Sequence, residues 1–163
     1  MTSAVAIRPA RRSDLDRLVA IENAAFETDR VSRRSFRRFV TASTAALLAA
    51  VRDGLVVGYA LVAFRRNSRG ARLYSLAVTP EAGRGVGWLL LQTVENEAAR
   101  RGCDRMRLEV DESNARAIRL YQRAGYEPHG RREDFYEDGA TALLYSKPLP
   151  APHDALAPKQ IQP

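Results

Sequence analysis

The pattern over residues 73–110 restricts the fold more than any other part of this sequence. An apolar run, LYSLAV, is followed by a glycine-rich turn, TPEAGRGVG, and then by helical periodicity over about 88–101. Gly102 is placed to end that helix, and apolar residues alternate again over 105–110. A strand, a helix and a second strand in this order form a crossover, so the two strands are predicted to lie parallel.

Antiparallel strands are predicted on both sides of this crossover. Asp53 and Gly54 separate the apolar runs 45–51 and 55–64, which is a strong hairpin signal. Further strands are expected at 4–7, 126–131 and 140–146, and a helix at 114–124 that stops at Gly125. The predicted fold is α/β of the α+β type, a mixed, mostly antiparallel sheet of six to seven strands with one parallel crossover and helices on both faces.

Two helices are expected before the hairpin. Ser13 is predicted to cap the first, with Asp14 and Asp16 in its first turn, and Ser32 is predicted to cap the second. The second helix also carries a group of arginines whose side chains largely avoid its apolar face: Arg33, Arg34, Arg37 and Arg38.

Length and composition favour a single domain. At 163 residues the chain is long enough to bury a core, and we expect residues 1–149 to form one domain and 150–163 a flexible tail. Cys103 is the only cysteine, so no internal disulfide is expected, and no metal site is predicted. Apolar runs stay far below the ~18 residues of a membrane span, so we expect a cytoplasmic protein without a membrane partner. The net charge of +7 favours polyanionic partners.

Gly83, Gly85 and Gly87 surround Arg84 where the strand turns into the helix. Glycines allow the backbone to turn tightly and approach a ligand, and free N–H groups at a helix start attract phosphate. A dinucleotide site would require a third glycine at the position that Leu90 occupies, so that reading stays a minor alternative.

Three polar residues that follow this loop are candidates for the functional site. Glu109 lies on the face of its predicted strand opposite the apolar residues and near the carboxyl end, where it is either a base or the ion-pair partner of a nearby arginine. Asn114 and Tyr121 lie seven residues apart and so share one face of the following helix. Taken alone, Asn114 is typical of a helix cap and Tyr121 is typical of a core residue.

The segments LYSLAVTPEAGRGVGWLLL and LEVDESNARAIRLYQRAGY resemble the acyl-CoA-binding core of the GNAT N-acetyltransferase superfamily, most of all its RimI type, which acetylates protein N-terminal amines. The similarity spans about residues 5–149. The resemblance implies acetyl-CoA as the cofactor, with Glu109 as general base and Tyr121 as general acid. It implies a set of cofactor-binding residues: Leu76, Ala77, Val78, Arg84, Gly85, Val86, Gly87, Trp88 and Asn114.

The acceptor side is less defined by the resemblance. Residues expected to flank the acceptor come from the loop 26–30 and the segment 131–139, namely Phe26, Asp29, Glu133, Asp134 and Tyr136. Acidic residues there suit a cationic amine. Ala82 departs from the family pattern, which usually has Gln or Arg at this position, so one phosphate contact is expected to be missing.

Several functions remain open on the sequence alone. The leading hypothesis is acetyl transfer to a protein or peptide N-terminal amine, and the alternative within the same class is a small-molecule amine. A different class is a non-catalytic module that binds acyl-CoA, RNA or ribosomes through the basic helix 33–38. Association with the ribosome and the choice between monomer and homodimer also stay open.

Overall fold

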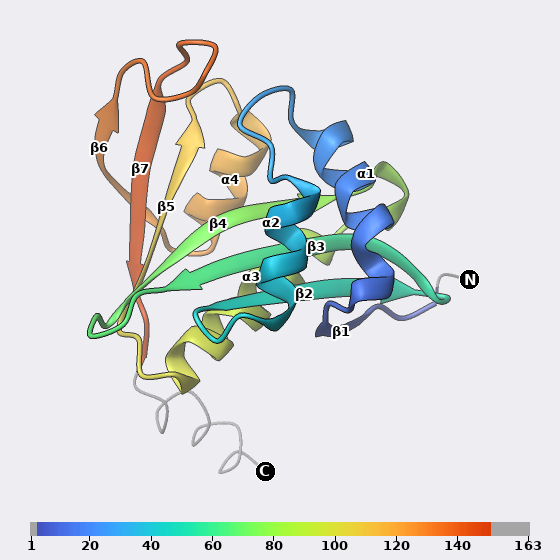
Figure 1. Ribbon diagram of the computed structural model, residues 1–163. Coiled ribbons are helices and arrows are strands. Elements are labelled where there is room, and N and C mark those ends of the chain that lie inside the picture. Colours follow the sequence, from blue (N-terminus) through green and yellow to red (C-terminus); the bar gives the residue numbers. More distant parts are fainter. Residues whose placement is uncertain (1–2, 151–163) are drawn as a thin grey trace.

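The computed structural model describes residues 3–150, which form one mixed sheet covered by helices (Figure 1). The sheet has the strand order β1-β2-β3-β4-β5-β7-β6, and all neighbours are antiparallel except β4 and β5. The predicted mostly antiparallel sheet with one parallel pair is confirmed. Its strands are β1 (Ala6–Pro9), β2 (Ala45–Arg52), β3 (Leu55–Phe64), β4 (Gly70–Val78), β5 (Arg105–Asp111), β6 (Glu127–Arg132) and β7 (Ala142–Pro148).

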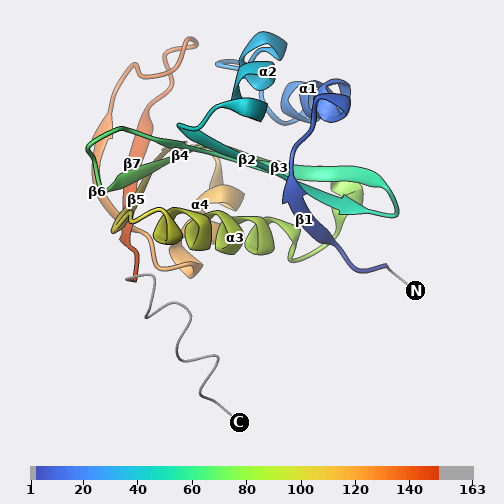
Figure 2. The ribbon, with the colours of Figure 1, turned by 60° about the horizontal axis from the view of Figure 1, so that its bottom comes forward.

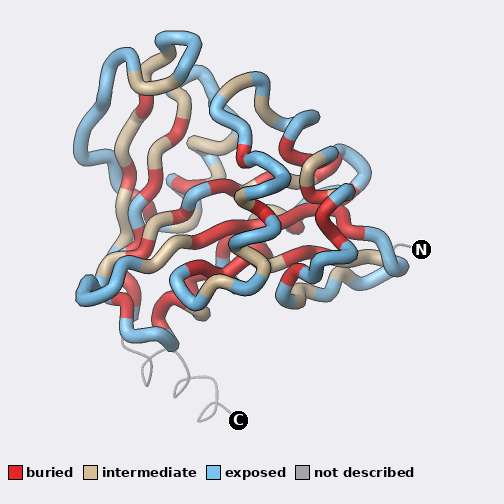
Figure 3. Tube along the Cα trace, in the orientation of Figure 1, coloured by how far each residue is buried: buried red, intermediate tan, exposed pale blue. Residues whose placement is uncertain are grey.

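The helices cover both faces of the sheet, as predicted (Figure 2). They are α1 (Leu15–Ala25), α2 (Arg33–Thr41), α3 (Val86–Arg100) and α4 (Ala115–Arg123), with short 3-10 turns η1 (Arg12–Asp14) and η2 (Pro80–Ala82). Helices α1 and α2 pack on one face around Leu18, Phe36 and Tyr59. Helices α3 and α4 pack on the other around Leu90 and Met106. In Figure 3 the buried segments follow these two cores, whereas the connecting loops are exposed.

The two parallel strands separate after a short contact. Pairing between β4 and β5 covers three positions and ends at Arg72 and Arg107. Beyond this point β4 continues to Val78 and β5 to Asp111, and the strands diverge visibly in Figure 1. The edge of β4 that faces β5 therefore has no partner strand over residues 73–78, and the sheet opens at this place.

A bulge in β4 turns neighbouring side chains to the same side of the sheet. Against β3, Ser75 pairs with Leu61 and Leu73 pairs with Val62, so Tyr74 is the extra residue. Leu73 belongs to the core under α3, whereas Ser75 bonds to α1 and Tyr74 contacts α2. Bulges commonly redirect side chains in this way beside functional sites.

The predicted hairpin is confirmed in detail. Arg52 pairs with Leu55, so the connection has two residues, Asp53 and Gly54. Both have positive φ, 52° and 78°. A two-residue turn of this kind matches the twist of the flanking strands, and Asp-Gly is among its preferred sequences.

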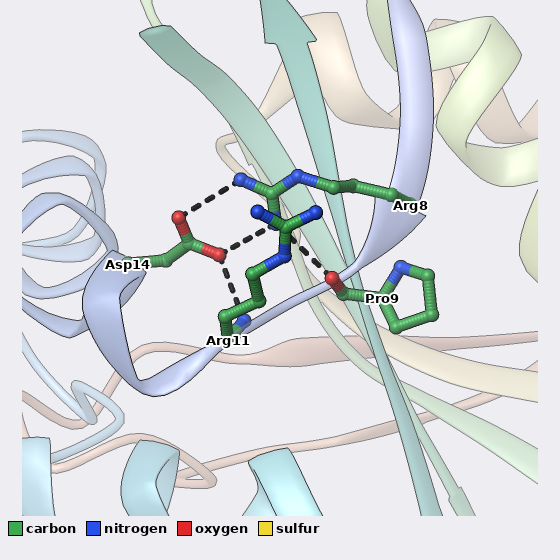
Figure 4. A network of polar contacts seen from close by, with 4 residues as sticks. All are labelled: Arg8, Pro9, Arg11 and Asp14. Atoms are coloured by element: carbon green, nitrogen blue, oxygen red, sulfur yellow. Dashed lines mark hydrogen bonds and ion pairs between the residues drawn. The ribbon is translucent and has the colours of Figure 1, made fainter. Parts of the chain in front are cut away.

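The predicted start of the first helix is wrong. Ser13 lies inside η1, and α1 begins only at Leu15, without a side-chain cap. Asp14 instead accepts hydrogen bonds from both terminal nitrogens of Arg8, at 2.7 and 3.0 Å, and from the backbone N–H of Arg11 at 2.8 Å (Figure 4). These bonds hold the pKa of Asp14 below its usual value, Arg8 being the largest cause. The helix therefore begins next to a side chain that is bonded to Arg8 of β1, and the predicted cap at Ser13 does not form.

The remaining differences concern boundaries. Strand β1 begins two residues later than expected, and α3 begins at Val86. The tail expected from residue 150 onward lies outside the described residues, apart from its first residue. No helix within residues 3–150 combines the length and apolarity needed to cross a membrane.

Candidate active site

The start of α3 is an open helix terminus without a side-chain cap. The preceding residue Gly85 has φ +87°, no side chain caps the helix, and its first turn contains no acidic residue. The first N–H groups of an α-helix lack intrahelical partners and favour anions. A Cβ placed on Gly83 or Gly85 would meet no atom within 4 Å, so the space beside the backbone is free. Arg84 between them is exposed.

The side chains around this terminus anchor it to the core. Val86 is 3 % exposed and packs inward, so only its backbone is available. Trp88 lies against α4, with the Arg123 guanidinium 5.5 Å from its ring centroid. The turn before the helix is held by Arg52, which donates to the carbonyl of Ala82 at 2.6 Å. Ala82 itself is fully buried and offers no polar side chain.

Glu109 lies where β5 separates from β4, and it is fixed by an arginine of β4. The Arg72 Nη2 and Nε atoms lie 2.6 and 2.8 Å from the Glu109 Oε1. The alternation of β5 confirms that Glu109 faces away from the α3 core, to which Met106, Leu108 and Val110 belong. Glu109 is thus the ion-pair partner of an arginine, and its carboxylate also lines the open cleft.

Tyr121 reaches the same cleft from α4. The helix ends in a Schellman motif, in which the N–H of Tyr126 donates to the carbonyl of Tyr121 and that of Gly125 to Gln122. The rings of Tyr121 and Tyr126 pack edge to face, 5.7 Å apart, and Tyr126 is bonded to Glu95 at 2.8 Å. Tyr121 is 7 % exposed, and this burial raises its pKa well above the ordinary value. The phenol therefore stays protonated throughout the physiological range.

A buried polar chain closes the cleft on the α1 side. The Glu22 carboxylate is 1 % exposed and accepts hydrogen bonds from the Ser75 hydroxyl, at 3.2 Å, and from the Val31 N–H, at 2.8 Å. Ser75 is in turn bonded to the Tyr59 hydroxyl at 2.9 Å. Burial raises the pKa of Glu22 and outweighs these bonds. A carboxyl group that lines the cleft is thus tied to both β4 and the end of the 26–32 loop.

Two loops far apart in the sequence are joined at the mouth of the cleft by a pair of hydrogen bonds between Asp29 and Glu137, which we call the clasp. The Asp29 N–H donates to Glu137 Oε1, and the Glu137 N–H donates to Asp29 Oδ2, both at 3.0 Å. Asp29 adopts φ +53° to make this arrangement. The connection between α1 and α2 is thereby joined to the connection between β6 and β7.

The cleft enclosed by these elements has a volume of about 640 Å³ and an acidic lining. Tyr136 lies among these carboxylates: burial, with Asp111, Glu109 and Asp29 nearby, raises its pKa to about 12, although Arg72 opposes the shift. A cation entering this region would be attracted by several carboxylates. No cluster of potential metal ligands occurs within residues 3–150.

The structure brings seven of the sixteen predicted site residues together in the cleft. They come from the catalytic, the cofactor-binding and the acceptor-binding predictions: Leu76, Glu109, Asn114, Tyr121, Phe26, Asp29 and Tyr136. Asn114 also caps α4, since its Oδ1 accepts from the Ala117 N–H. Glu133 and Asp134 lie in an exposed turn and do not line the cleft. Gly85 and its neighbours form the helix terminus described above.

Sequence reasoning missed several residues of the cleft. Arg72 and Asp111 contribute charge, and Glu22 and Ser75 contribute the buried polar chain. A signal was present for Glu22, because a carboxylate occupied the apolar face of a predicted helix together with Leu15 and Leu18. Ser75 similarly interrupts the apolar run LYSLAV.

Comparison with known proteins agrees with this geometry. Residues 14–126 match the acetyltransferase (GNAT) family. An uncharacterized N-acetyltransferase of Methanocaldococcus jannaschii is 35% identical over 146 residues, which is 88% of this chain and 92% of that protein. A putative ribosomal protein bS18-alanine N-acetyltransferase of Bacillus subtilis is 27% identical, over 88% of this chain and 95% of that protein.

Solved structures support the same assignment. The ribosomal-protein-S18-alanine N-acetyltransferase of Escherichia coli superposes with a TM-score of 0.77 at 27% identity, covering 90% of this chain and 94% of that one. The open terminus of α3, the divergence of β4 from β5 and these similarities lead to one assignment. The chain belongs to the GNAT family and is an acyl-CoA-dependent N-acetyltransferase with RimI-like homologues.

Proposed function

We propose that this enzyme transfers the acetyl group of acetyl-CoA to the N-terminal α-amine of a protein or peptide. The observation that carries the proposal is the meeting of Glu109 and Tyr121 in one acidic cleft beside the gap between β4 and β5. The RimI-like relatives, whose names specify N-acetylation of an alanine of a ribosomal protein, support a protein acceptor.

The residues present fit acetyl-CoA, which supplies an activated acetyl thioester. The unpartnered edge of β4 leaves the backbone groups of Leu76 and Val78 free to bond an amide-bearing arm. Those of the predicted Ala77 face β3 instead, because the Thr79 N–H donates to Val57 and bonding to β3 alternates along the strand. The uncapped terminus of α3, with Gly85 and Gly87 and the exposed Arg84, suits a pyrophosphate. Trp88 lies in the first turn of the same helix, and Asn114 lines the cleft together with Leu76 of β4.

Glu109 is proposed as the general base. An α-amine has a pKa of ~7.7–8.0, so a sizeable fraction is neutral near pH 7.5, whereas a lysine amine at ~10.4 is almost wholly protonated. A carboxylate that accepts the proton through water is a sufficient base for an α-amine and a poor one for a lysine amine. The ion pair with Arg72 fixes the direction in which the Glu109 carboxylate faces the cleft.

Tyr121 is proposed as the general acid. Its raised pKa makes complete proton transfer to a thiolate in water unfavourable, because an ordinary thiol has a pKa near ~8.5. The leaving sulfur, however, develops its charge in the same poorly solvated cleft, where a hydrogen bond from the phenol is strong. Tyr121 therefore donates a hydrogen bond first and its proton as the negative charge on sulfur builds up.

The acceptor is proposed to enter between the two clasped loops. Phe26, Asp29 and Tyr136 line this side and are the acceptor-binding residues that we retain. The carboxylates near Tyr136 attract the protonated amine, which then loses its proton close to Glu109.

The test measures steady-state acetylation of short peptides with free N-termini by the wild type and by Tyr121→Phe. The readout is the release of the coenzyme A thiol. Phenylalanine keeps the ring contact with Tyr126, so folding should be preserved. We expect kcat to fall at least tenfold, or about 1.4 kcal/mol, with little change in the Kd of acetyl-CoA. Near-normal turnover of Tyr121→Phe would remove its catalytic role, and turnover of small amines but not peptides would remove the proposed acceptor.

A further inference from the structure

A second hollow lies beside the acceptor cleft and carries the opposite charge. Its volume is about 420 Å³, and it is lined by Ala63, Phe64, Arg65, Ser68, Gly70, Arg72 and Arg107. Three arginines thus surround one hollow, and no carboxylate belongs to its lining. Arg72 lines both this basic hollow and the acidic cleft, so the two spaces are neighbours.

Two of these arginines are available to a ligand. Arg72 is committed to Glu109, but within residues 3–150 the side chains of Arg65 and Arg107 form neither an ion pair nor a hydrogen bond. Arg72 and Arg107 are direct neighbours in the parallel pairing of β4 and β5. Neighbouring like charges repel each other, and an anion between them would relieve that repulsion.

An exposed tyrosine of the acidic cleft lies beside Arg72, the residue that the two spaces share. Tyr74, the bulged residue of β4, is 48% exposed, and its ring lies 6.3 Å from that of Phe39 on α2. The Arg72 guanidinium stacks 5.0 Å from the Tyr74 ring centroid. An exposed aromatic surface of this kind supports the backbone of a ligand that passes from one space to the other.

We propose that the basic hollow is an acceptor subsite for an acidic side chain located a few residues after the N-terminal amine. This inference rests on the proposed function and specifies its substrate class. Arg107 and Glu109 are two residues apart on β5, about 7 Å along the strand. An extended peptide covers that distance in two residues, so the acidic residue belongs at about the third or fourth position.

The charges of the neighbouring cleft favour a peptide over a nucleic acid. A polyanion that filled the basic hollow would extend past Glu109, Asp111 and Asp29, whose carboxylates repel phosphate. A peptide with one amine and one carboxylate matches both spaces, because each of its charges meets the opposite sign.

The test compares peptides that differ only in Asp or Asn at one of positions 2–6. We expect kcat/KM to be about tenfold higher for Asp at position 3 or 4, and this ratio to fall to about one in the double variant Arg65→Gln, Arg107→Gln. The matched control is Arg66→Gln, an exposed arginine of the same hairpin that lies outside the hollow. It should retain the preference.

Binding of the acetylated product peptides separates this inference from the proposed function, because it needs no turnover. Tighter binding of the Asp product than of the Asn product, lost in the double variant, would support the subsite even if the catalytic assignment failed. Equal binding and equal kcat/KM at every position would overturn the subsite while leaving peptide acetylation intact. Binding of a single-stranded RNA that disappears in the double variant, without any Asp preference, would overturn it in favour of a nucleic-acid site.

Discussion

The proposed cofactor side and the proposed acceptor side of this enzyme offer different kinds of groups for binding. On the cofactor side, the groups available for binding belong mostly to the backbone, namely the free edge of β4 and the N–H groups at the start of α3. On the acceptor side they are side chains, and more than half of the residues that line the cleft are charged or carry a hydroxyl group. We expect the first arrangement to suit a ligand common to a large family, and the second to change by substitution without altering the fold.

The largest effect is expected from the residue at the junction of the two sides. Glu109→Gln keeps an oxygen for Arg72 but removes the base, so kcat/KM should fall about 100-fold, with the Kd of acetyl-CoA unchanged. Steady-state kinetics and acetyl-CoA titration measure the two quantities. Glu112→Gln, on an exposed residue paired with Arg131, is the control. Normal activity of Glu109→Gln would reduce Glu109 to a structural partner of Arg72.

A substitution at the glycine-rich turn before α3 should change binding on the cofactor side alone. Gly85→Ala places a methyl group in the free space at the start of α3, at φ +87°, and we expect the Kd of acetyl-CoA to rise about tenfold, or ~1.4 kcal/mol. Gly102→Ala is a close control, because that glycine has φ +91° and equally open surroundings at the other end of the helix. Equal loss of affinity in both variants would point to helix strain instead of the phosphate site.

Loosening the clasp should act on the acceptor side alone. Glu137→Ala removes the acceptor of the Asp29 N–H bond, so the two loops should separate more often and the acceptor KM should rise about three- to fivefold. Glu133→Ala, in the exposed turn outside the cleft, should leave KM unchanged. An altered Kd of acetyl-CoA in Glu137→Ala would show that the two sides are coupled.

The smallest effect concerns the buried carboxyl group of α1. Because burial raises the pKa of Glu22, its contribution to stability is complete below the ordinary pKa and is lost as the pH rises through the raised value. Glu22→Gln abolishes this titration, so the Tm of the variant minus that of the wild type should be higher at about pH 8 than at about pH 4. Glu27→Gln, on an exposed neighbour, should show no such trend. A constant difference would mean that Glu22 titrates normally.

The same division explains what could be predicted from sequence. The cofactor side depends on short-range signals: Gly83 and Gly85 adopt positive φ, and Gly125 ends α4 with Tyr126 packed against Tyr121. Such signals lie within a few residues of each other and follow from backbone chemistry. The strands and the crossover could be predicted from the sequence for the same reason.

The acceptor side could be predicted only in part. Phe26, Asp29 and Tyr136 line the cleft as expected, but the contacts that hold this side together join distant segments. The clasp links residues 108 positions apart, and Glu22 meets Ser75 across 53 positions. The misplaced start of α1 has the same cause, since Asp14 is engaged by Arg8 of β1. No local pattern specifies which partner such a side chain will find.

The bulge at Tyr74 has a consequence for how this chain tolerates change in length. A regular strand presents one side chain to a given face every two residues, but here Tyr74 and Ser75 both serve the acceptor side while Leu73 remains in the α3 core. Deleting Tyr74 would restore regular alternation and leave Leu73 and Ser75 on their present faces, opposite Val62 and Leu61. The strand should therefore fold after the loss of this one residue, whereas a deletion away from the bulge would turn the following side chains of β4 to the wrong face.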